Sequence, residues 1–322
     1  MRRSAFVARA RLGPAIALLG TLAACRSLPT VDESPAPEID FAEIYHLAEL
    51  YRSVRFDSAE KIHADWDGRY ELLEVVEIQS TRNRYLLGIL PQGRQEVVIR
   101  GTANWTNAVF DVRIRRHWNA ELGIELHKGF EEMATALLLD LVPRLRTERE
   151  VVLFGHSLGA AEAVILGLLL DKRGYTVRRV YASGQPRVTD TDGAQRCGGF
   201  PVLRIVNAND LVPLLPSVRD LAPARSYRHF GDALMLLDGP YYVYFRGDYV
   251  NEERGAMLWR ALLHGQLLEE FHEHSIWNYL ARIAPKLDVA LQVPFQDRMR
   301  FLYGPQAPGR KMKPSAGSPS IE

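Results

Sequence analysis

One serine stands in a turn between two apolar segments and is the residue best suited to act as a nucleophile. The continuous apolar run Val151–Phe154 is typical of a strand buried on both faces of a parallel sheet, and Leu158–Lys172 is long and apolar enough for a helix. Between them lies Gly155-His156-Ser157-Leu158-Gly159, with a glycine at each point where strand and helix nearly collide. The pattern predicts a strained strand–turn–helix elbow that presents Ser157 for acyl transfer.

A serine nucleophile requires two partners from elsewhere in the chain. A neutral histidine must take the hydroxyl proton, and a carboxylate must fix the tautomer of that histidine. In sheets of this topology the acid and then the base follow the serine, on loops at the carboxyl ends of later strands. Asp210 directly follows the predicted strand Val202–Val206. The histidines after Asp210 are the candidate bases, namely His229, His264, His272 and His274.

A series of motifs between about residues 75 and 280 resembles, in order, the signatures of the fungal-type class 3 lipase family. They are Arg100-Gly101-Thr102, Asn104-Trp105, His127-Lys128-Gly129-Phe130, the Ser157 elbow, Ser183-Gly184-Gln185-Pro186-Arg187-Val188, Arg204 to Pro216, and Tyr227-Arg228-His229-Phe230-Gly231. The resemblance implies an α/β-hydrolase fold and the hydrolysis of carboxylic esters through an acyl-enzyme intermediate. Any single motif would be weak evidence for the resemblance, but the occurrence of all of them in the same order as in the family is hard to obtain by chance.

The resemblance also implies roles for individual residues. Asp210 matches the family's acid through its flanking Val-Pro and Leu-Pro pairs, and His274 matches a base that lies shortly before a tyrosine, with His272 as the alternative. The backbone N–H of Leu158 is one expected oxyanion donor. Thr102, the residue after Arg-Gly, is the other. We expect His229 to be structural and His156 to point away from the site as a packing residue.

One departure from the family concerns the segment that would cover the site. In fungal lipases a helical lid lies between Arg-Gly-Ser/Thr and the downstream His-x-Gly-Phe, but here Asn104-Trp105 follows Thr102 with fewer intervening residues than usual. The segment Ala103–Arg113 still carries enough apolar residues to form a small flap. Further along, Glu252–Phe271 has the wide apolar face of a helix that packs on the sheet or, alternatively, touches lipid.

The remaining periodicity predicts strands that alternate with helices, which is typical of a mostly parallel central sheet with helices on both faces, as in the α/β-hydrolase fold. Helices are expected near Phe41–Tyr51, Gly129–Arg146 and Leu158–Lys172, and strands at Leu72–Gln79, Tyr85–Leu90, Glu96–Arg100, Val151–Phe154, Val177–Ala182, Val202–Val206, Ala233–Leu237 and Tyr241–Phe245. Two hairpins are expected, across Pro91–Arg94 and Asp238–Pro240.

The first residues have the pattern of a bacterial secretion signal. A basic start precedes an apolar stretch, and Leu22-Ala23-Ala24-Cys25 resembles the lipobox of bacterial lipoproteins, in which Cys25 becomes the lipidated first residue. The predicted organisation is a signal peptide at 1–24, a lipidated Cys25 with a flexible tether at 25–38, a hydrolase domain at 39–303 and a disordered tail at 304–322. Arg26 after the cysteine favours the outer membrane, if the organism has one. The alternatives are an ordinary signal peptide and an uncleaved anchor in which the cysteine occurs by chance.

Composition excludes several classes of protein. The 322 residues are 47% hydrophobic and 25% charged, which fits globular domains and neither a disordered nor a fibrous chain. Loss of the four arginines in residues 1–24 would turn the formal net charge of +1 into −3, so nucleic-acid binding is not expected. Cys197, the only other cysteine, has no feature of a nucleophile.

The sequence therefore predicts a serine hydrolase of lipid esters, similar to triacylglycerol lipases, that is held at a membrane through Cys25. Phospholipase A1 and short-chain esterase activities are the alternatives within this class. A non-catalytic envelope binding module is the alternative from another class. No metal ligand spacing is present, so neither a metal nor an organic cofactor is implied. Oligomeric state is left open.

Overall fold

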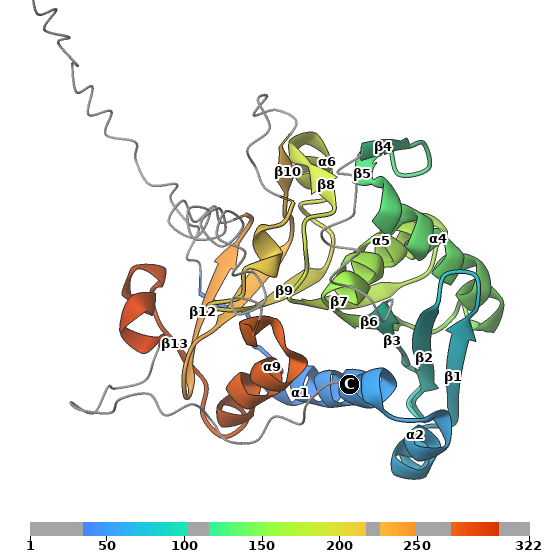
Figure 1. The fold of residues 1–322 in the computed structure, drawn as a ribbon, viewed down its shortest axis with the longest axis horizontal. Helices are drawn as coiled ribbons and strands as arrows, with labels where there is room; N and C mark the ends of the chain where they lie inside the picture. The colour runs from blue at the N-terminus through green and yellow to red at the C-terminus, as the bar shows by residue number, and fades with distance from the viewer. Residues whose placement is uncertain (1–34, 102–115, 217–225, 249–271, 303–322) are drawn as a thin grey trace, which may run out of the picture. The chain divides into compact units, whose positions relative to one another are not determined.

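In a computed structural model, residues 35–101, 116–216, 226–248 and 272–302 are described (Figure 1). Within these ranges the main sheet has nine strands in the order β1-β2-β3-β6-β7-β9-β11-β12-β13. The central run from β3 through β6, β7 and β9 to β11 is parallel throughout. The pairs β1–β2, β2–β3 and β11–β12 are antiparallel, and the edge strand β13 pairs with β12 in parallel. Parallel neighbours require crossover connections. The connections from β3 to β6, from β6 to β7 and from β7 to β9 contain α4, α5 and α6.

The helices and strands have the following bounds. The α-helices are α1 Phe41–Phe56, α2 Ala59–Trp66, α4 Lys128–Leu141, α5 Leu158–Lys172, α6 Thr191–Arg196 and α9 Ile276–Ile283. The strands of the main sheet are β1 Leu72–Ile78, β2 Asn83–Ile89, β3 Gln95–Gly101, β6 Val151–His156, β7 Val177–Ser183, β9 Val202–Asn207, β11 Asp232–Leu236, β12 Tyr241–Arg246 and β13 Leu291–Gln292. A smaller sheet contains β4 Arg116–Asn119, β5 Ile124–His127, β8 Thr189–Asp190 and β10 Tyr227–Arg228. The 3-10 helices are η1 Asp67–Arg69, η2 Val142–Arg144, η3 Val212–Leu214, η5 His272–His274, η6 Ala284–Lys286 and η7 Phe295–Phe301.

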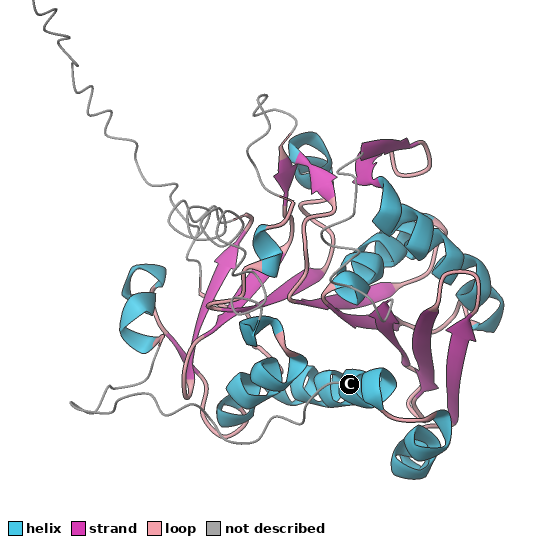
Figure 2. Ribbon diagram, in the orientation of Figure 1, coloured by secondary structure: helices cyan, strands magenta, loops and turns pink. Residues whose placement is uncertain are grey.

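Alternate residues of the central strands pack against helices on opposite faces of the sheet. In β3, Val97 and Ile99 belong to the apolar cluster that contains α4 and α5, and Val98 belongs to the cluster that contains α1 and α9. Figures 1 and 2 show α4 and α5 on one side of the strands and α1 and α9 on the other. Because helices cover both faces of the sheet, the sequences of these strands are continuous apolar runs. The predicted layered fold is confirmed.

The structure also departs from the sequence predictions in places. The helix expected over Gly129–Arg146 ends at Leu141 and continues as the 3-10 turn η2, because Pro143 lacks an N–H and its ring clashes with an α-helical carbonyl. The small sheet was not predicted. Its strands β8 and β10 have two residues each and β4 is largely polar, so these three carry no apolar alternation. The remaining strand, β5, alternates apolar and polar residues but over only four positions.

Several predictions lie outside the described residues. They concern the signal peptide and Cys25, most of the tether, Thr102, the flap at Ala103–Arg113, the helix expected over Glu252–Phe271, and the tail from residue 304. Those interpretations stay predictions. Among the residues that are described, no helix is both long and apolar enough to cross a bilayer.

A buried carboxyl on α5 predicts a pH dependence of stability. Glu162 is fully buried, and its Oε2 accepts a hydrogen bond from Asn83 Nδ2 at 3.0 Å. Burial raises the pKa of Glu162 to about 8. Between about pH 4.5 and 8 the folded protein therefore keeps a proton that the unfolded chain has lost, so the free energy of unfolding falls as pH rises, by up to about 1.4 kcal/mol per pH unit.

The variant Glu162→Gln is expected to remove this slope, because the amide keeps the acceptor for Asn83 and carries no titrating group. Urea unfolding at several pH values between 5 and 8 measures it. Glu132→Gln, at an exposed position of α4, is the control and should leave the slope unchanged. Parallel pH profiles for wild type and Glu162→Gln would contradict the prediction.

Candidate active site

Ser157 lies on the predicted elbow between β6 and α5. Its backbone has φ 59° and ψ −127°, a left-handed conformation that residues with a Cβ rarely adopt. Glycines are required on both sides of Ser157 because backbone atoms of neighbouring segments approach them closely. A Cβ on Gly155 would lie 2.1 Å from the carbonyl oxygen of Gly159, and one on Gly159 would lie 2.3 Å from that of Ile99. The strand–turn–helix geometry expected from the sequence is confirmed.

Asp210 and His274, the predicted acid and base, are brought together in the interior. Asp210 follows β9 and is 1% exposed, and His274 ends η5 and is 3% exposed. His274 Nδ1 lies 2.7 Å from Asp210 Oδ2. Because an ionised carboxylate can only accept, this contact places a proton on Nδ1 and leaves Nε2 as the basic nitrogen of the neutral ring. His274 therefore has the orientation that a general base requires.

Both oxygens of Asp210 accept hydrogen bonds. Besides His274, the hydroxyl of Tyr279 on α9 donates to Oδ2 at 2.5 Å, and the backbone N–H of Val212 donates to Oδ1 at 2.9 Å. A buried carboxylate remains ionised at modest cost only when such donors surround it. Tyr279 was not assigned a role from the sequence, although its place shortly after the base was a usable signal.

His274 packs against residues that flank the Ser157 elbow. The ring of His156 stacks on that of His274 with centroids 4.7 Å apart, and His156 Nε2 lies 2.8 Å from the carbonyl oxygen of His274. On the other side, a Cβ on Gly184 would lie 2.8 Å from His274 Cε1 and 3.1 Å from Asp210 Oδ2. The backbone N–H of Ser157 donates a hydrogen bond at 2.9 Å to the carbonyl oxygen of Ser183, the residue just before Gly184. The base thus lies beside the elbow, and Gly184 makes room for it.

Two other histidines have different surroundings. His156 is buried, its Nδ1 lies 3.0 Å from Ser183 Oγ, and burial and then His274 hold its pKa well below the ordinary range. His156 therefore does not point away from the site as expected: it is a neutral residue that packs on the ring of His274 and supports its backbone. His272, the alternative base, is exposed and contacts Asn278, and no contact joins it to Asp210 among the described residues.

The N-terminus of α5 provides a site for developing negative charge. Leu158 is the first residue of α5, so its N–H has no partner within the helix. Helix dipoles favour an anion at this position. Gly101, at the end of β3 with φ +72°, passes so close that a Cβ would lie 2.8 Å from the backbone nitrogen of Gly159. Thr102, the second predicted donor, follows Gly101 and lies outside the described residues.

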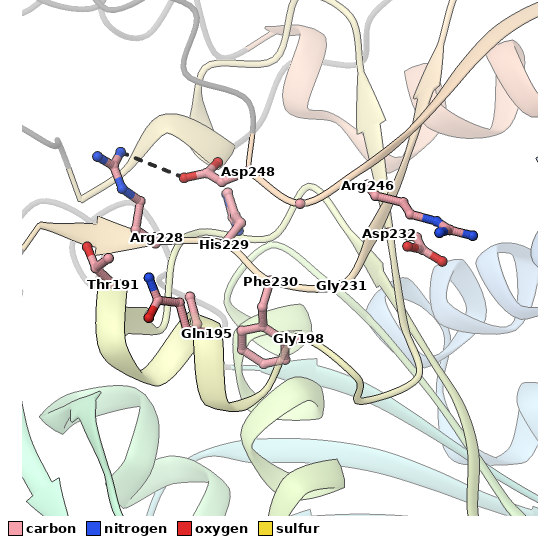
Figure 3. Close-up of a pocket in the computed structure, with 12 residues that line it drawn as sticks. Thr191, Gln195, Gly198, Arg228, His229, Phe230, Gly231, Asp232, Arg246 and Asp248 are labelled. Atoms are coloured by element: carbon pink, nitrogen blue, oxygen red, sulfur yellow. Dashed lines mark ion pairs between the residues drawn. The ribbon is translucent and has the colours of Figure 1, made fainter. Parts of the chain in front are cut away.

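A cavity of about 280 Å³ lies elsewhere. It is lined by residues of α6, of β10 and β11 with their connection, and of β12 with the residues after it (Figure 3). None of Ser157, Asp210 or His274 lines it. The chemistry predicted from the sequence therefore belongs to the elbow rather than to this cavity.

The parallel central sheet with helices on both faces is the architecture of the α/β-hydrolase fold. Residues 96–220 match the model of the family described as lipase (class 3). The lipase of Rhizomucor miehei is 28% identical over 196 residues, which cover 54% of this chain and 53% of the relative. The chain thus spans about half the length of that curated relative.

Solved structures establish the fold. Lipase II from Rhizopus niveus superposes with a TM-score of 0.51 at 21% identity, over 62% of this chain and 80% of that one. Lip2 lipase from Yarrowia lipolytica gives a TM-score of 0.52 at 18% identity, over 70% and 93% of the two chains. The predicted α/β-hydrolase fold is confirmed.

The backbone of Ser157 yields a prediction about stability. A side chain held in this conformation costs about 1–3 kcal/mol, which glycine avoids. We expect the free energy of unfolding of Ser157→Gly to be roughly 1 kcal/mol larger than that of Ser157→Ala. This difference is what remains of the relieved strain after the greater conformational freedom of glycine in the unfolded chain is subtracted. Urea unfolding of the two variants makes the comparison. An alanine variant at least as stable as the glycine variant would show that the elbow is not strained.

Proposed function

We propose that this protein is a serine hydrolase that cleaves carboxylic esters of lipids, with Ser157, His274 and Asp210 as its catalytic residues. The observation that carries the proposal is the buried 2.7 Å contact between His274 Nδ1 and Asp210 Oδ2, beside an elbow that holds Ser157 at positive φ. The match to the class 3 lipase family supports lipid esters as the substrate class, as do relatives named lipase.

The reaction begins when the Ser157 hydroxyl attacks the ester carbonyl while His274 Nε2 takes its proton. Asp210 keeps the proton on Nδ1 and stabilises the imidazolium that forms. The N–H of Leu158, with Thr102 as the proposed second donor, stabilises the oxyanion of the tetrahedral intermediate. His274 then protonates the leaving alcohol, which yields an acyl-enzyme. Water, deprotonated by His274, releases the carboxylic acid and restores Ser157.

We further propose that the mature protein is a bacterial lipoprotein anchored in the cell envelope through Cys25, with the outer membrane as its location where one exists. The lipobox-like Leu22-Ala23-Ala24-Cys25 supports this proposal. An anchored enzyme has phospholipids and other membrane esters within reach. A triacylglycerol-like ester is the proposed substrate, and a series of esters that differ in head group and acyl length would identify the preferred one.

The catalytic assignment is tested by labelling and by hydrolysis. A fluorophosphonate probe should label the wild-type protein at Ser157 and should not label Ser157→Ala. Hydrolysis of a p-nitrophenyl ester should fall at least about 10³-fold in kcat/KM for Ser157→Ala and for His274→Ala.

His272→Ala is the matched control, because that exposed histidine lies two residues from His274. It should keep kcat/KM within about threefold of wild type, since it has no contact with Asp210. A folded wild-type protein that neither reacts with the probe nor hydrolyses any ester would contradict the enzyme assignment and favour a binding module. Loss of activity in His272→Ala with activity retained in His274→Ala would contradict the choice of base.

The anchor is tested in a bacterial host that processes lipoproteins. Wild-type protein should incorporate labelled palmitate and sediment with membranes, whereas Cys25→Ser should do neither, because the thiol that accepts the lipid is absent. Cys197→Ser is the control and should still incorporate label. Equal incorporation by wild type and Cys25→Ser would contradict lipidation at this residue.

A further inference from the structure

The loop that follows Asp210 is fixed by side chains from two other segments. His229 Nε2 donates to the carbonyl oxygen of Pro213 at 2.7 Å. Arg187 Nη1 donates to the carbonyl oxygens of Leu214 and, at 3.0 Å, of Pro216. The backbone N–H of Arg187 donates to Leu215 at 2.7 Å. Four successive carbonyls, from 213 to 216, thus accept hydrogen bonds from only two residues.

These contacts matter because the loop has little regular structure of its own. Within the described part of this loop, residues 211–216, the only helical turn is η3, which has three residues. Arg187 is 2% exposed and His229 is 6% exposed, so water cannot readily replace their donors. A buried carbonyl left without a donor destabilises the folded state. The conformation of residues 213–216 therefore depends on Arg187 and His229.

The charged groups around Arg187 and His229 favour the forms of these side chains that donate hydrogen bonds. The Nε atom of Arg187 lies 3.8 Å from Asp248 Oδ2, and Arg228 Nη1 lies 3.9 Å from the same oxygen. Figure 3 shows Arg228 and Asp248 facing each other near His229. Burial, together with Arg204, lowers the pKa of His229 to about 3. His229 is therefore neutral at any working pH, and its Nε2–H is a permanent donor.

The fixed loop connects directly to the acid. Val212, whose N–H donates to Asp210 Oδ1, immediately precedes Pro213, which His229 holds. We propose that Arg187 and His229 are positioning residues that act through Asp210, by fixing residues 213–216 so that Val212 and His274 meet the two oxygens of the carboxylate. This inference rests on the proposed function, because it assigns both residues to the same reaction.

A double-mutant cycle tests the proposal. Arg187→Met and His229→Leu are each made in the wild-type protein and in Asp210→Asn, and kcat/KM is measured with an activated ester. In the wild-type background each should lower kcat/KM at least about tenfold, chiefly through kcat. In the Asp210→Asn background the same changes should cost less than about threefold, because the group that they position is already lost.

The matched control is Lys286→Met. Lys286 is equally buried, and its Nζ donates to three carbonyls, of Leu237, Gly239 and Arg282, none of them in the loop at 213–216. Its replacement should lower the melting temperature, and so should the replacement of Arg187, because each change leaves buried carbonyls without donors. Any change in kcat/KM should be the same in both backgrounds.

The pair His229→Gln and His229→Leu provides a second test that does not depend on Arg187→Met folding. The terminal amide nitrogen of glutamine can occupy the place of His229 Nε2, so His229→Gln should recover most of the kcat that His229→Leu loses. Equal fold losses in both backgrounds, unchanged kcat/KM, or a Gln variant as impaired as the Leu variant would overturn the positioning role. An inactive wild-type protein would instead overturn the proposed function, so the two failures are distinct.

Discussion

The carboxylate of Asp210 is the constraint on which the rest of the site depends. A charge that is 1% exposed is stable in the interior only if donors surround it, and three meet it here, from η5, α9 and the loop after the acid itself. Each donor carries a structural requirement with it. The contact with His274 fixes the tautomer of the base, that with Tyr279 fixes the start of α9, and that with Val212 fixes the course of the loop.

The same constraint explains why small residues surround the site. His274 can reach Asp210 only if the chain leaving β7 lacks a side chain at Gly184, and the elbow at Ser157 can form only if Gly155 and Gly159 let β6 and α5 nearly touch. His156 completes the packing on the face of the sheet that α1 and α9 cover. Its ring lies against those of Tyr51, His274 and Tyr279. The contacts that hold the residues proposed for catalysis are thus also contacts that pack the core, and helices and strands fix their positions.

Much of this arrangement could be predicted from the sequence because its signals are local. The spacing of the glycines predicts the elbow, and unbroken apolar runs such as Val151–Phe154 predict the parallel strands. The pairing of Asp210 with His274, 64 residues apart, followed only from a resemblance, since no local pattern distinguishes His274 from His272. Tyr279 and Gly184 act through contacts made in three dimensions, and the two-residue strands of the small sheet are too short to show a period.

The crystal structure of the protein after reaction with a fluorophosphonate would test the central claim most directly. The account predicts phosphorus bonded to Ser157 Oγ, the phosphonyl oxygen about 3 Å from the backbone nitrogen of Leu158, and His274 Nε2 within hydrogen-bond distance of the adduct, with Asp210 still on Nδ1. An adduct on another residue, or an adduct on Ser157 with the imidazole of His274 turned away from it, would contradict the account.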